Sequence, residues 1–241
     1  MPSIIVTGAS SGIGYATAEH FLKMGWTVGL VARRADRLEG LASLYDTAVP
    51  LPADVTVEAE VDAAFDGFAE TQRLDVLFNN AGIFGPLTTI DEISLADWQR
   101  VVDVNLTGMF LCARAAFRIM RHQTPRGGRI INNGSISAHT PRERSVCYTS
   151  TKHAVSGLTK TITVDGRAFD IACGQIDIGN ARTDMVLDLE KKRLTEGLSP
   201  LPSMAVEDVA ASVYHMAQLP PEANVQTMMV MASKMPHIGR G

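Results

Sequence analysis

Residues Ile4–Gly14 read IIVTGASSGIG, and this short run sets the fold of everything that follows it. An apolar segment ends in a turn that contains three glycines, and a helical pattern begins at Ile13. Glycine permits φ above 0 and lets the backbone approach a ligand closely. The first turn of the helix then offers unpaired N–H groups and the positive end of its dipole to a phosphate. We therefore predict a strand, a phosphate-binding turn and a helix at the start of an α/β fold.

The glycines of this turn follow the spacing Gly-x-x-x-Gly-x-Gly, which differs from the general dinucleotide pattern Gly-x-Gly-x-x-Gly. A plain Gly/Ser turn has the same composition, so the spacing is informative only between a strand and a helix. That context is met here, and it indicates a site for the pyrophosphate of a dinucleotide. The candidate residues are Gly8, Ser10, Ser11, Gly12, Ile13 and Gly14.

Strand-like and helix-like segments alternate along the rest of the chain. Short apolar runs predict strands at Ile4–Thr7, Thr27–Val31, Ala48–Leu51, Leu74–Phe78, Arg129–Asn132, Ile171–Ile176 and Gln226–Met231. Helical patterns lie at Ile13–Met24, Ala35–Leu44, Glu58–Glu70, Leu95–Arg121, Val146–Val164 and Val206–Gln218. Such alternation predicts a single domain over residues 1–241, with a doubly wound, mostly parallel seven-stranded sheet and helices on both faces. The runs lack polar alternation, so we expect strands buried on both faces and ligands at their carboxyl ends.

Composition argues against several other classes of protein. The chain has 241 residues, of which 46% are hydrophobic and 20% charged, as is ordinary for a globular domain. A net charge of −4 gives no basic surface for nucleic acid, and we expect no membrane span because no apolar run is long enough. Cys112, Cys147 and Cys173 have neither metal-ligand nor disulfide spacing, so we expect no bound metal. With a start that shows no signal-like segment, these thiols predict a cytoplasmic location.

The end of the second predicted strand is where an acidic residue would bind the ribose 2′-hydroxyl of NAD. Here the strand ends Val31-Ala32-Arg33-Arg34, without an acid. A pair of arginines suits a phosphate dianion, so Arg33 and Arg34 predict a preference for NADP, with NAD as the second choice. The alternative is that these two side chains only solubilise a loop.

A Tyr-x-x-x-Lys pair lies further along, at Tyr148 and Lys152. On a helix these residues share a face, so the ammonium is expected near the phenol ring. A phenol has a pKa of about 10, and a nearby cation lowers it. The pair therefore predicts an acid/base group that works near neutral pH. The same spacing also arises when a half-buried tyrosine lies beside a lysine whose stem packs against it.

Further motifs occur in order along the chain. They are Asp54-Val55 after the third strand, Asn79-Asn80-Ala81-Gly82 after the fourth, and Asn105 in the long helical stretch. Together with the glycine turn and the Tyr-x-x-x-Lys pair, they resemble the classical short-chain dehydrogenases/reductases over nearly the whole chain. The resemblance implies a Rossmann fold, with Asp54 and Val55 at the adenine ring, Asn80, Ala81 and Gly82 beside the adenosine ribose, and Asn105 in a proton relay.

The resemblance places the catalytic serine 13 residues before the tyrosine, at Ser135. Ser137 is then a pocket residue or a turn hydroxyl that satisfies local backbone. Asn133-Gly134 replaces the Ser-Ser that usually stands at this point in the family. The family's Pro-Gly after the sixth strand is likewise replaced by Ile178-Gly179, which removes a rigid proline.

Two more segments with predicted roles follow Ile178. Gly179, Ala181 and Thr183 keep positions at which the family contacts the nicotinamide side of its cofactor. Residues 184–203 are polar and charged, and they form either a substrate lid or an ordinary surface helix and turn.

The implied reaction is hydride transfer between NADP(H) and a secondary alcohol/ketone pair. Ser135 would hydrogen-bond the carbonyl oxygen and Tyr148 would move the proton, while Lys152 would lower the Tyr148 pKa and bind the nicotinamide ribose. Asn105 would link Lys152 to solvent through water. Two other functions use related chains: a non-catalytic dinucleotide sensor, and a nucleotide-sugar epimerase or dehydratase, which generally carries a larger C-terminal domain.

The small-molecule substrate is left open by the sequence. The candidate substrate contacts are Ser135, Ser137, His139 and Tyr148, with Arg142, Arg144 and Asn180 nearby. The arginines either attract an acidic substrate or belong to a solvated loop. The resemblance also implies a homodimer or homotetramer, to which the apolar run Val225–Met231 and the tail Pro236–Gly241 would contribute. For the tail, a disordered terminus is the alternative.

Overall fold

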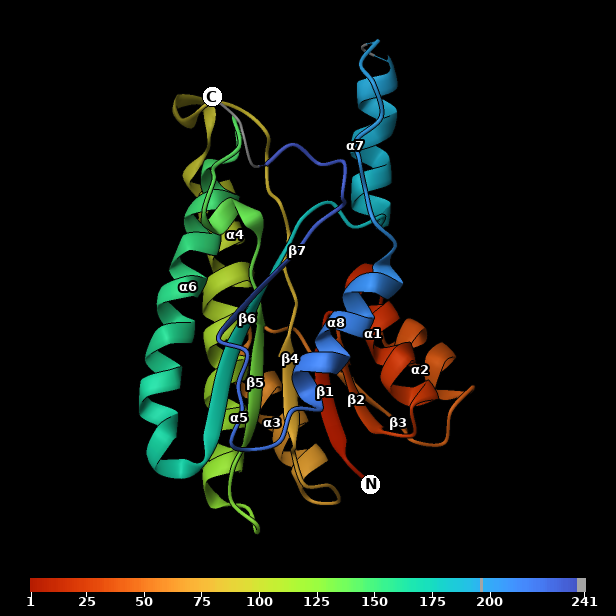
Figure 1. The fold of residues 1–241 in the computed structure, drawn as a ribbon, viewed down its shortest axis with the longest axis vertical. Helices are drawn as coiled ribbons and strands as arrows, with labels where there is room; N and C mark the ends of the chain where they lie inside the picture. Colours follow the sequence, from red (N-terminus) through yellow and green to blue (C-terminus); the bar gives the residue numbers. More distant parts are fainter. Residues whose placement is uncertain (196, 238–241) are drawn as a thin grey trace.

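The apolar runs of the sequence pair side by side into one seven-stranded parallel sheet (Figure 1). The computed structural model describes residues 1–195 and 197–237. The strands are β1 (Ser3–Thr7), β2 (Thr27–Ala32), β3 (Ala48–Pro52), β4 (Val76–Asn79), β5 (Gly128–Asn133), β6 (Ile171–Ile178) and β7 (Thr227–Val230). They lie in the order β3-β2-β1-β4-β5-β6-β7, and every neighbouring pair is parallel. The predicted doubly wound Rossmann fold is confirmed.

Helices cover both faces of this sheet (Figure 1). One layer holds α1 (Gly12–Lys23), α2 (Ala35–Ala42) and α8 (Val206–Ala217), and the other holds α3 (Glu58–Ala69), α5 (Gly108–His122) and α6 (Val146–Gly166). Each of these helices buries one apolar stripe against the sheet; on α3 the stripe includes Phe65 and Phe68. Burying a side chain of this size contributes roughly 1.5–3 kcal/mol, so the two layers together fix the sheet.

The edges of the sheet depart from the predicted burial. The five inner strands are almost wholly buried, but β3 and β7 are only partly covered. Met229 on β7 is 42% exposed. The expectation of burial on both faces is wrong for these two strands, because an edge strand has a neighbour on one side only.

The predicted helix Leu95–Arg121 is also interrupted. It consists of α4 (Leu95–Val102), a π-helical turn at Asp103–Thr107, and α5. In this turn the N–H of Gly108 donates to the carbonyl of Asp103, five residues back instead of four. Asn105 lies within this π-helical turn.

The remaining differences from the predicted elements are small. Boundaries of the predicted strands and helices agree to within about two residues. The structure adds α7 (Asp184–Thr195) and three 3-10 turns, at Ile90–Glu92, Ile136–Ala138 and Arg167–Phe169. Figure 1 shows α7 projecting beyond the carboxyl ends of the strands. Among the helices of the described residues, none combines the length and apolar character that crossing a bilayer requires.

The strand order reverses between β1 and β4, and the glycine turn lies at that point. Here α1 begins at Gly12, and its first turn lies against the backbone of Gly8. A Cβ on Gly14 would overlap the carbonyl oxygen of Gly8 and lie 2.7 Å from Nδ2 of Asn80. Glycine at position 14 therefore allows the close approach of α1 to the strand ends.

Replacing Gly14 by alanine should destabilise the protein by about 1–3 kcal/mol, because the overlap is with rigid backbone. Chemical denaturation would measure this change. Gly67 is the matched control, since it is exposed on α3 with nothing within 4 Å of an added Cβ. Gly67→Ala should instead raise stability by up to about 1 kcal/mol. Equal stabilities for the two variants would contradict the packing argument.

Candidate active site

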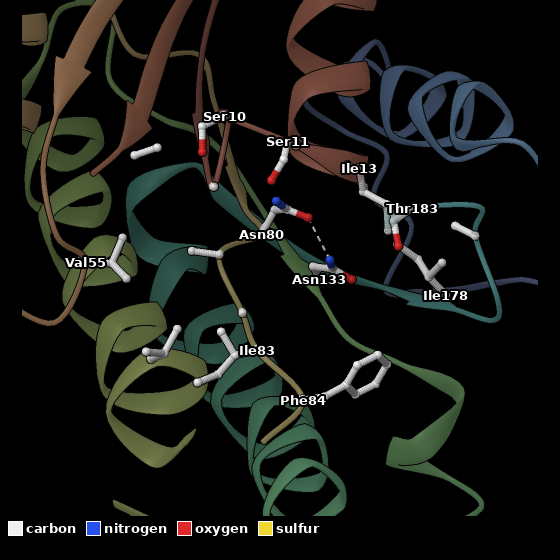
Figure 2. A pocket seen from close by; sticks show the side chains of 18 of the residues that line it. Ser10, Ser11, Ile13, Val55, Asn80, Ile83, Phe84, Asn133, Ile178 and Thr183 are labelled. Carbon is white, nitrogen blue, oxygen red and sulfur yellow. Dashed lines mark hydrogen bonds between the residues drawn. The ribbon is translucent and has the colours of Figure 1, made fainter. Parts of the chain in front are cut away.

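A cavity of about 430 Å³ opens at the carboxyl ends of the strands, at the point where the strand order reverses. Figure 2 shows Ser10, Ser11, Asn80 and Thr183 among the side chains around it. Every residue predicted to contact the cofactor lines this one cavity. They are Gly8, Ser10, Ser11, Gly12, Ile13, Gly14, Arg33, Arg34, Asp54, Val55, Asn80, Ala81, Gly82, Tyr148, Lys152, Gly179, Ala181 and Thr183.

The glycine turn forms the floor of the cavity with bare backbone. Gly8 and Gly12 have φ values of 70° and 55°, which favour glycine. A Cβ on Gly8 would lie 2.9 Å from Nδ2 of Asn80. Ser11, the residue before α1, makes no side-chain cap, so the first N–H groups of the helix have no such partner. This is the arrangement that binds a pyrophosphate.

Two arginines border the same turn. The Arg34 guanidinium donates to Ser10 Oγ at 2.9 Å and to Ser11 Oγ at 3.0 Å. Arg33 lies 3.8 Å from the carboxylate of Asp54, and its side chain is 76% exposed. Both line the cavity beyond the end of β2. A phosphate at this end would meet two cations, one of them fixed to the turn.

A chain of hydrogen bonds ties the glycine turn to the Tyr-x-x-x-Lys pair. Thr7 Oγ1 accepts from the backbone N–H of Asn80 at 2.8 Å, and Asn80 Nδ2 donates to the Thr7 carbonyl at 2.8 Å. Asn133 Nδ2 donates to Asn80 Oδ1 at 2.8 Å, the dashed line in Figure 2. Lys152 Nζ then donates to the Asn133 carbonyl at 2.7 Å. The chain crosses β1, β4, β5 and α6 in turn.

The phenol of Tyr148 is partly buried and stacked against Phe84, with ring centroids 4.5 Å apart. Lys152 Nζ lies 5.4 Å from the Tyr148 ring centroid, as the helical spacing predicts. Burial raises the pKa of Tyr148 above its ordinary value, and hydrogen bonding to Ser135 and the charge of Arg142 lower it. The prediction that the nearby lysine brings this pKa down is therefore wrong for the protein alone, because burial outweighs the lowering influences.

Lys152 is itself buried, and this changes its acidity. Its side chain lies in the interior with 3% of the residue exposed. Burial lowers the pKa of Lys152 from 10.5 to about 8, while the charge of Asp177 opposes that change. The ammonium is therefore held near its titration point, under conditions in which exposed lysines are fully charged.

Asn105 is fully buried in the π-helical turn. Its side-chain amide donates to the Ile83 carbonyl at 2.8 Å and accepts from the Ile83 N–H at 2.8 Å. The same amide lies 3.3 Å from Thr151 Oγ1, next to Lys152 in the chain. Asn105 thus fixes the loop after β4 against α6. Its predicted water link to Lys152 stays a prediction.

The three predicted residues after β5 are not among those that line the cavity. Ser135 is 3% exposed, and its Oγ accepts from the Ser137 N–H at 3.1 Å. Ser137 is fully buried, and its hydroxyl has no hydrogen-bond partner within the described residues. His139 binds Asp177, with Nε2 2.7 Å from Oδ2. Of these three, Ser135 hydrogen-bonds the Tyr148 phenol through its side chain.

Sequence reasoning missed three residues of this region. Phe84 packs on the Tyr148 ring, Asn133 joins Asn80 to Lys152, and Asp177 lies buried behind Ser135. Asp177 and Asn133 could have been noticed in the sequence, because polar side chains in otherwise apolar strands must find hydrogen-bond partners. Phe84 could not, since its position depends on the path of the loop after β4.

The segment after β6 closes one side of the cavity. The amide of Asn180 accepts from Arg142 Nη2 at 3.0 Å and donates to the Pro202 carbonyl at 3.1 Å. The Cγ2 of Thr183 would lie 3.1 Å from a Cβ on Gly12, so Thr183 stands against the glycine turn. Asp184 and Val186, at the start of α7, also line the cavity.

Comparison with known proteins identifies this arrangement. A family model described as short chain dehydrogenase matches residues 2–194. The chain belongs to the short-chain dehydrogenase family. This assignment makes it an NAD(P)-dependent oxidoreductase of the alcohol/ketone type, and it confirms the resemblance that the motifs indicate.

Individual relatives support the family assignment. The chain is 30% identical over 244 residues to serine 3-dehydrogenase of Agrobacterium fabrum. The alignment covers 95% of this chain and 93% of that protein. The chain is 37% identical over 178 residues to 3beta-hydroxysteroid dehydrogenase of Mediterraneibacter gnavus, covering 72% of this chain and 63% of that relative. A solved structure, the closed form of serine dehydrogenase complexed with NADP+, superposes with a TM-score of 0.89 at 26% identity, covering 99% and 98% of the two chains.

The buried lysine makes a prediction about stability and pH. The folded-state pKa of Lys152 is about 8 and the ordinary value is 10.5, so below pH 8 the folded state carries the full cost of a buried ammonium. That cost is about 3 kcal/mol, and it falls as pH rises from 8 to 10.5, where the unfolded chain binds more protons. Lys152→Met should therefore gain stability relative to the wild type at pH 7, and the gain should shrink toward pH 10.

Chemical denaturation of both proteins across this pH range provides the measurement. Lys160→Met is the matched control, because it removes the same charge from an exposed position on α6. A stability difference for Lys152→Met that does not change between pH 7 and pH 10 would contradict the argument.

Proposed function

We propose that this protein reduces a ketone to a secondary alcohol, or runs the reverse reaction, with NADP(H) as the preferred cofactor. One observation carries the proposal. A single cavity joins the glycine turn, which suits a pyrophosphate, to Tyr148 and Lys152, which suit proton transfer. The turn and the Tyr-x-x-x-Lys pair lie far apart in the sequence, and the parallel sheet brings them to one edge.

The residues of the cavity fit a nicotinamide dinucleotide. The glycine turn offers backbone without side chains, and the start of α1 offers N–H groups for the diphosphate. Asp54, Val55 and Asn80 would hold the adenosine half, and Lys152, Gly179 and Thr183 the nicotinamide half. When bound, the nicotinamide supplies or accepts the hydride.

The chain's own residues would handle the proton. Ser135 Oγ is held by the Ser137 N–H, and it would orient the substrate oxygen toward Tyr148. The Tyr148 hydroxyl would donate its proton to the developing alkoxide, or accept it in oxidation. Lys152 would fix the geometry of the pair through the Asn133 carbonyl. Asn105 would take part in the proton relay, and its side chain is held in place by hydrogen bonds to the loop after β4 and to α6.

The NADP preference rests on Arg33 and Arg34, which stand where an acid would repel a 2′-phosphate. The NADP+ in the serine dehydrogenase complex is consistent with it. NAD would bind through the remaining contacts with lower affinity. Arg34 has a second role, because it also braces Ser10 and Ser11 of the turn.

Residues 184–203 are proposed as the substrate lid. The segment leaves the sheet after Thr183 and returns at Met204, whose N–H donates to the Asn180 carbonyl at 2.9 Å. The base of the segment is tied to the sheet in this way, while α7 stands beyond the strand ends (Figure 1). Closure of such a segment would exclude water from the reacting atoms.

Two further proposals concern the setting of the enzyme. Assembly into a dimer or tetramer is supported by exposed apolar side chains at Leu95 (79% exposed), Phe110 (46%) and Met229 (42%). The predicted tail contact involves Pro236 and His237, while residues 238–241 lie outside the described residues. A reducing cytoplasm is supported by three free, buried cysteines.

Tyr148→Phe tests the chemistry most directly. Phenylalanine keeps the contact with Phe84 but cannot move a proton, so turnover should fall by about 10²–10⁴-fold or more while NADPH binding stays nearly unchanged. The assay is NADPH consumption over a panel of ketones, sugars, steroids and β-ketoacyl esters, with NADH in parallel. Tyr214→Phe, on α8, is the matched control.

Two outcomes of this assay would contradict the proposal. Turnover by Tyr148→Phe at the wild-type rate would exclude Tyr148 as the acid/base. Tight NADPH binding by the wild type without consumption across the whole panel would favour a dinucleotide sensor.

Arg33→Ala tests the cofactor preference. Losing a charge-assisted contact to a phosphate should weaken NADPH binding by about tenfold to a hundredfold and leave NADH binding unchanged. Arg34→Ala should weaken both, because it also releases Ser10 and Ser11. Titration of each cofactor by fluorescence gives the constants, with the exposed Arg37→Ala on α2 as control. Equal losses for NADPH and NADH in Arg33→Ala would argue against the 2′-phosphate contact.

A further inference from the structure

A carboxylate lies buried directly behind the predicted catalytic serine. Asp177 belongs to β6, between Ile176 and Ile178, and it has no exposed surface. A charged group in such a place needs strong partners, because removing a carboxylate from water is costly. The proposed hydride and proton steps make no use of it, so its presence calls for an explanation.

Asp177 is hydrogen-bonded to residues around the predicted catalytic serine. Its Oδ1 accepts from the backbone N–H of Ser135 at 2.9 Å and from Gln175 Nε2 at 2.7 Å. Its Oδ2 is 2.7 Å from Nε2 of His139, a side chain that is 42% exposed. Gln175 is itself held by Ser156 Oγ on α6 at 3.0 Å. The carboxylate thus fixes the backbone of Ser135 and is in turn fixed from two sides.

Asp177 also accounts for one unusual stretch of the sequence. A Cβ on Gly134 would overlap Oδ1 of Asp177 and lie 2.7 Å from Nε2 of Gln175. Residue 134 must therefore be glycine while residue 177 is aspartate. The Asn133-Gly134 pair, which departs from the family's pattern, is thus fitted to this carboxylate at its glycine.

The charge of Asp177 also reaches the acid/base pair. It raises the pKa of both groups. In Tyr148 it adds to the effect of burial, whereas in Lys152 it opposes burial. Arg142, from the segment after β5, also acts on the phenol by its charge, and Lys152 on α6 lies 5.4 Å from the ring centroid. His139, from the same segment, pairs with Asp177 itself. A change at Asp177 should therefore alter the acidity of the pair without touching it.

We propose that Asp177 is a positioning residue, which holds the backbone of Ser135 in place and supplies a fixed negative charge behind Tyr148 and Lys152. Gln175 and His139 orient its two oxygens. The proposal rests on the proposed alcohol/ketone chemistry, in which Ser135 orients the substrate oxygen. It assigns a role to a residue that touches neither substrate nor cofactor.

Two substitutions separate the hydrogen bonds from the charge. Asp177→Asn keeps an oxygen for the Ser135 N–H, and its amide can donate to His139 when the imidazole proton moves to Nδ1. Asp177→Ala removes both the bonds and the charge. We expect the asparagine variant to keep kcat at its own optimum pH within a few fold, and to shift its pH–rate profile to lower pH on the order of one unit.

The alanine variant should lose kcat on the order of a hundredfold, because a misplaced group near the chemistry has that effect. NADPH affinity should stay within about twofold in both variants, because Asp177 is not among the described residues that line the cavity. Asp170→Asn is the matched control. It changes the same residue type at the other end of β6, in an exposed ion pair with Arg126, and its φ of 58° suits asparagine.

A second readout needs no substrate. The phenolate absorbance of Tyr148 can be titrated in the near ultraviolet, with each protein's Tyr148→Phe counterpart as the blank. The apparent pKa should be lower in Asp177→Asn than in the wild type and unchanged in Asp170→Asn. Absence of turnover in the wild type would defeat the proposed function and leave this titration intact.

Either of two results would overturn the role of Asp177. One is a phenol titration and pH–rate profile that shift equally in Asp177→Asn and Asp170→Asn. The other is a kcat for folded Asp177→Ala within twofold of the wild type. Should the alanine variant fail to fold by circular dichroism, the asparagine variant and its titration decide the question.

Discussion

The side chain of Asn80 spans the gap where the sheet reverses its strand order, and the site depends on that bridge. The connections after β1 and β4 lead to helices on opposite faces of the sheet, which leaves an opening beyond the carboxyl ends of these two strands. Asn80 ties the end of β1 to Asn133 on β5, and the Asn133 carbonyl then fixes Lys152. The opening that receives a dinucleotide is therefore bordered by the same bonds that place the lysine. The same hydrogen bonds therefore shape the proposed cofactor site and position the proposed acid/base pair.

The site holds two ionisable side chains whose charged forms are disfavoured by burial in the folded protein. Lys152 lies in the interior with its pKa lowered, and Tyr148 is partly buried with its pKa raised. Neither shift helps the protein without ligand to fold. Both arise from removal of water, and the same removal strengthens every electrostatic interaction with a substrate or cofactor that enters. The stabilising layers of apolar side chains on the two faces of the sheet offset this local cost.

Much of the fold and of the site follows from residue patterns. The apolar runs and glycine turn predict seven strands and their carboxyl-end site, because local sequence determines these features. Three features depend on contacts between distant segments and could not be predicted in this way. They are the edge exposure of β3 and β7, the π-helical turn at Asp103–Thr107, and the partners of His139. His139 is a loop residue by sequence, and only the fold sets it against a carboxylate 38 positions away. The Tyr148 pKa likewise depends on burial, which no spacing expresses.

The π-helical turn at Asp103–Thr107 constrains the length of the chain. A π turn accommodates one residue more than a regular α-helix would at the same place. Deleting a single residue here would let α4 and α5 join as an uninterrupted helix, with better backbone geometry. The phase of α4 relative to α5 would then turn by about 100°, and the buried amide of Asn105 would leave Ile83. Among descendants of this gene, substitutions can accumulate on the exposed face of α4, whereas shortening by one codon in this turn would be removed by selection.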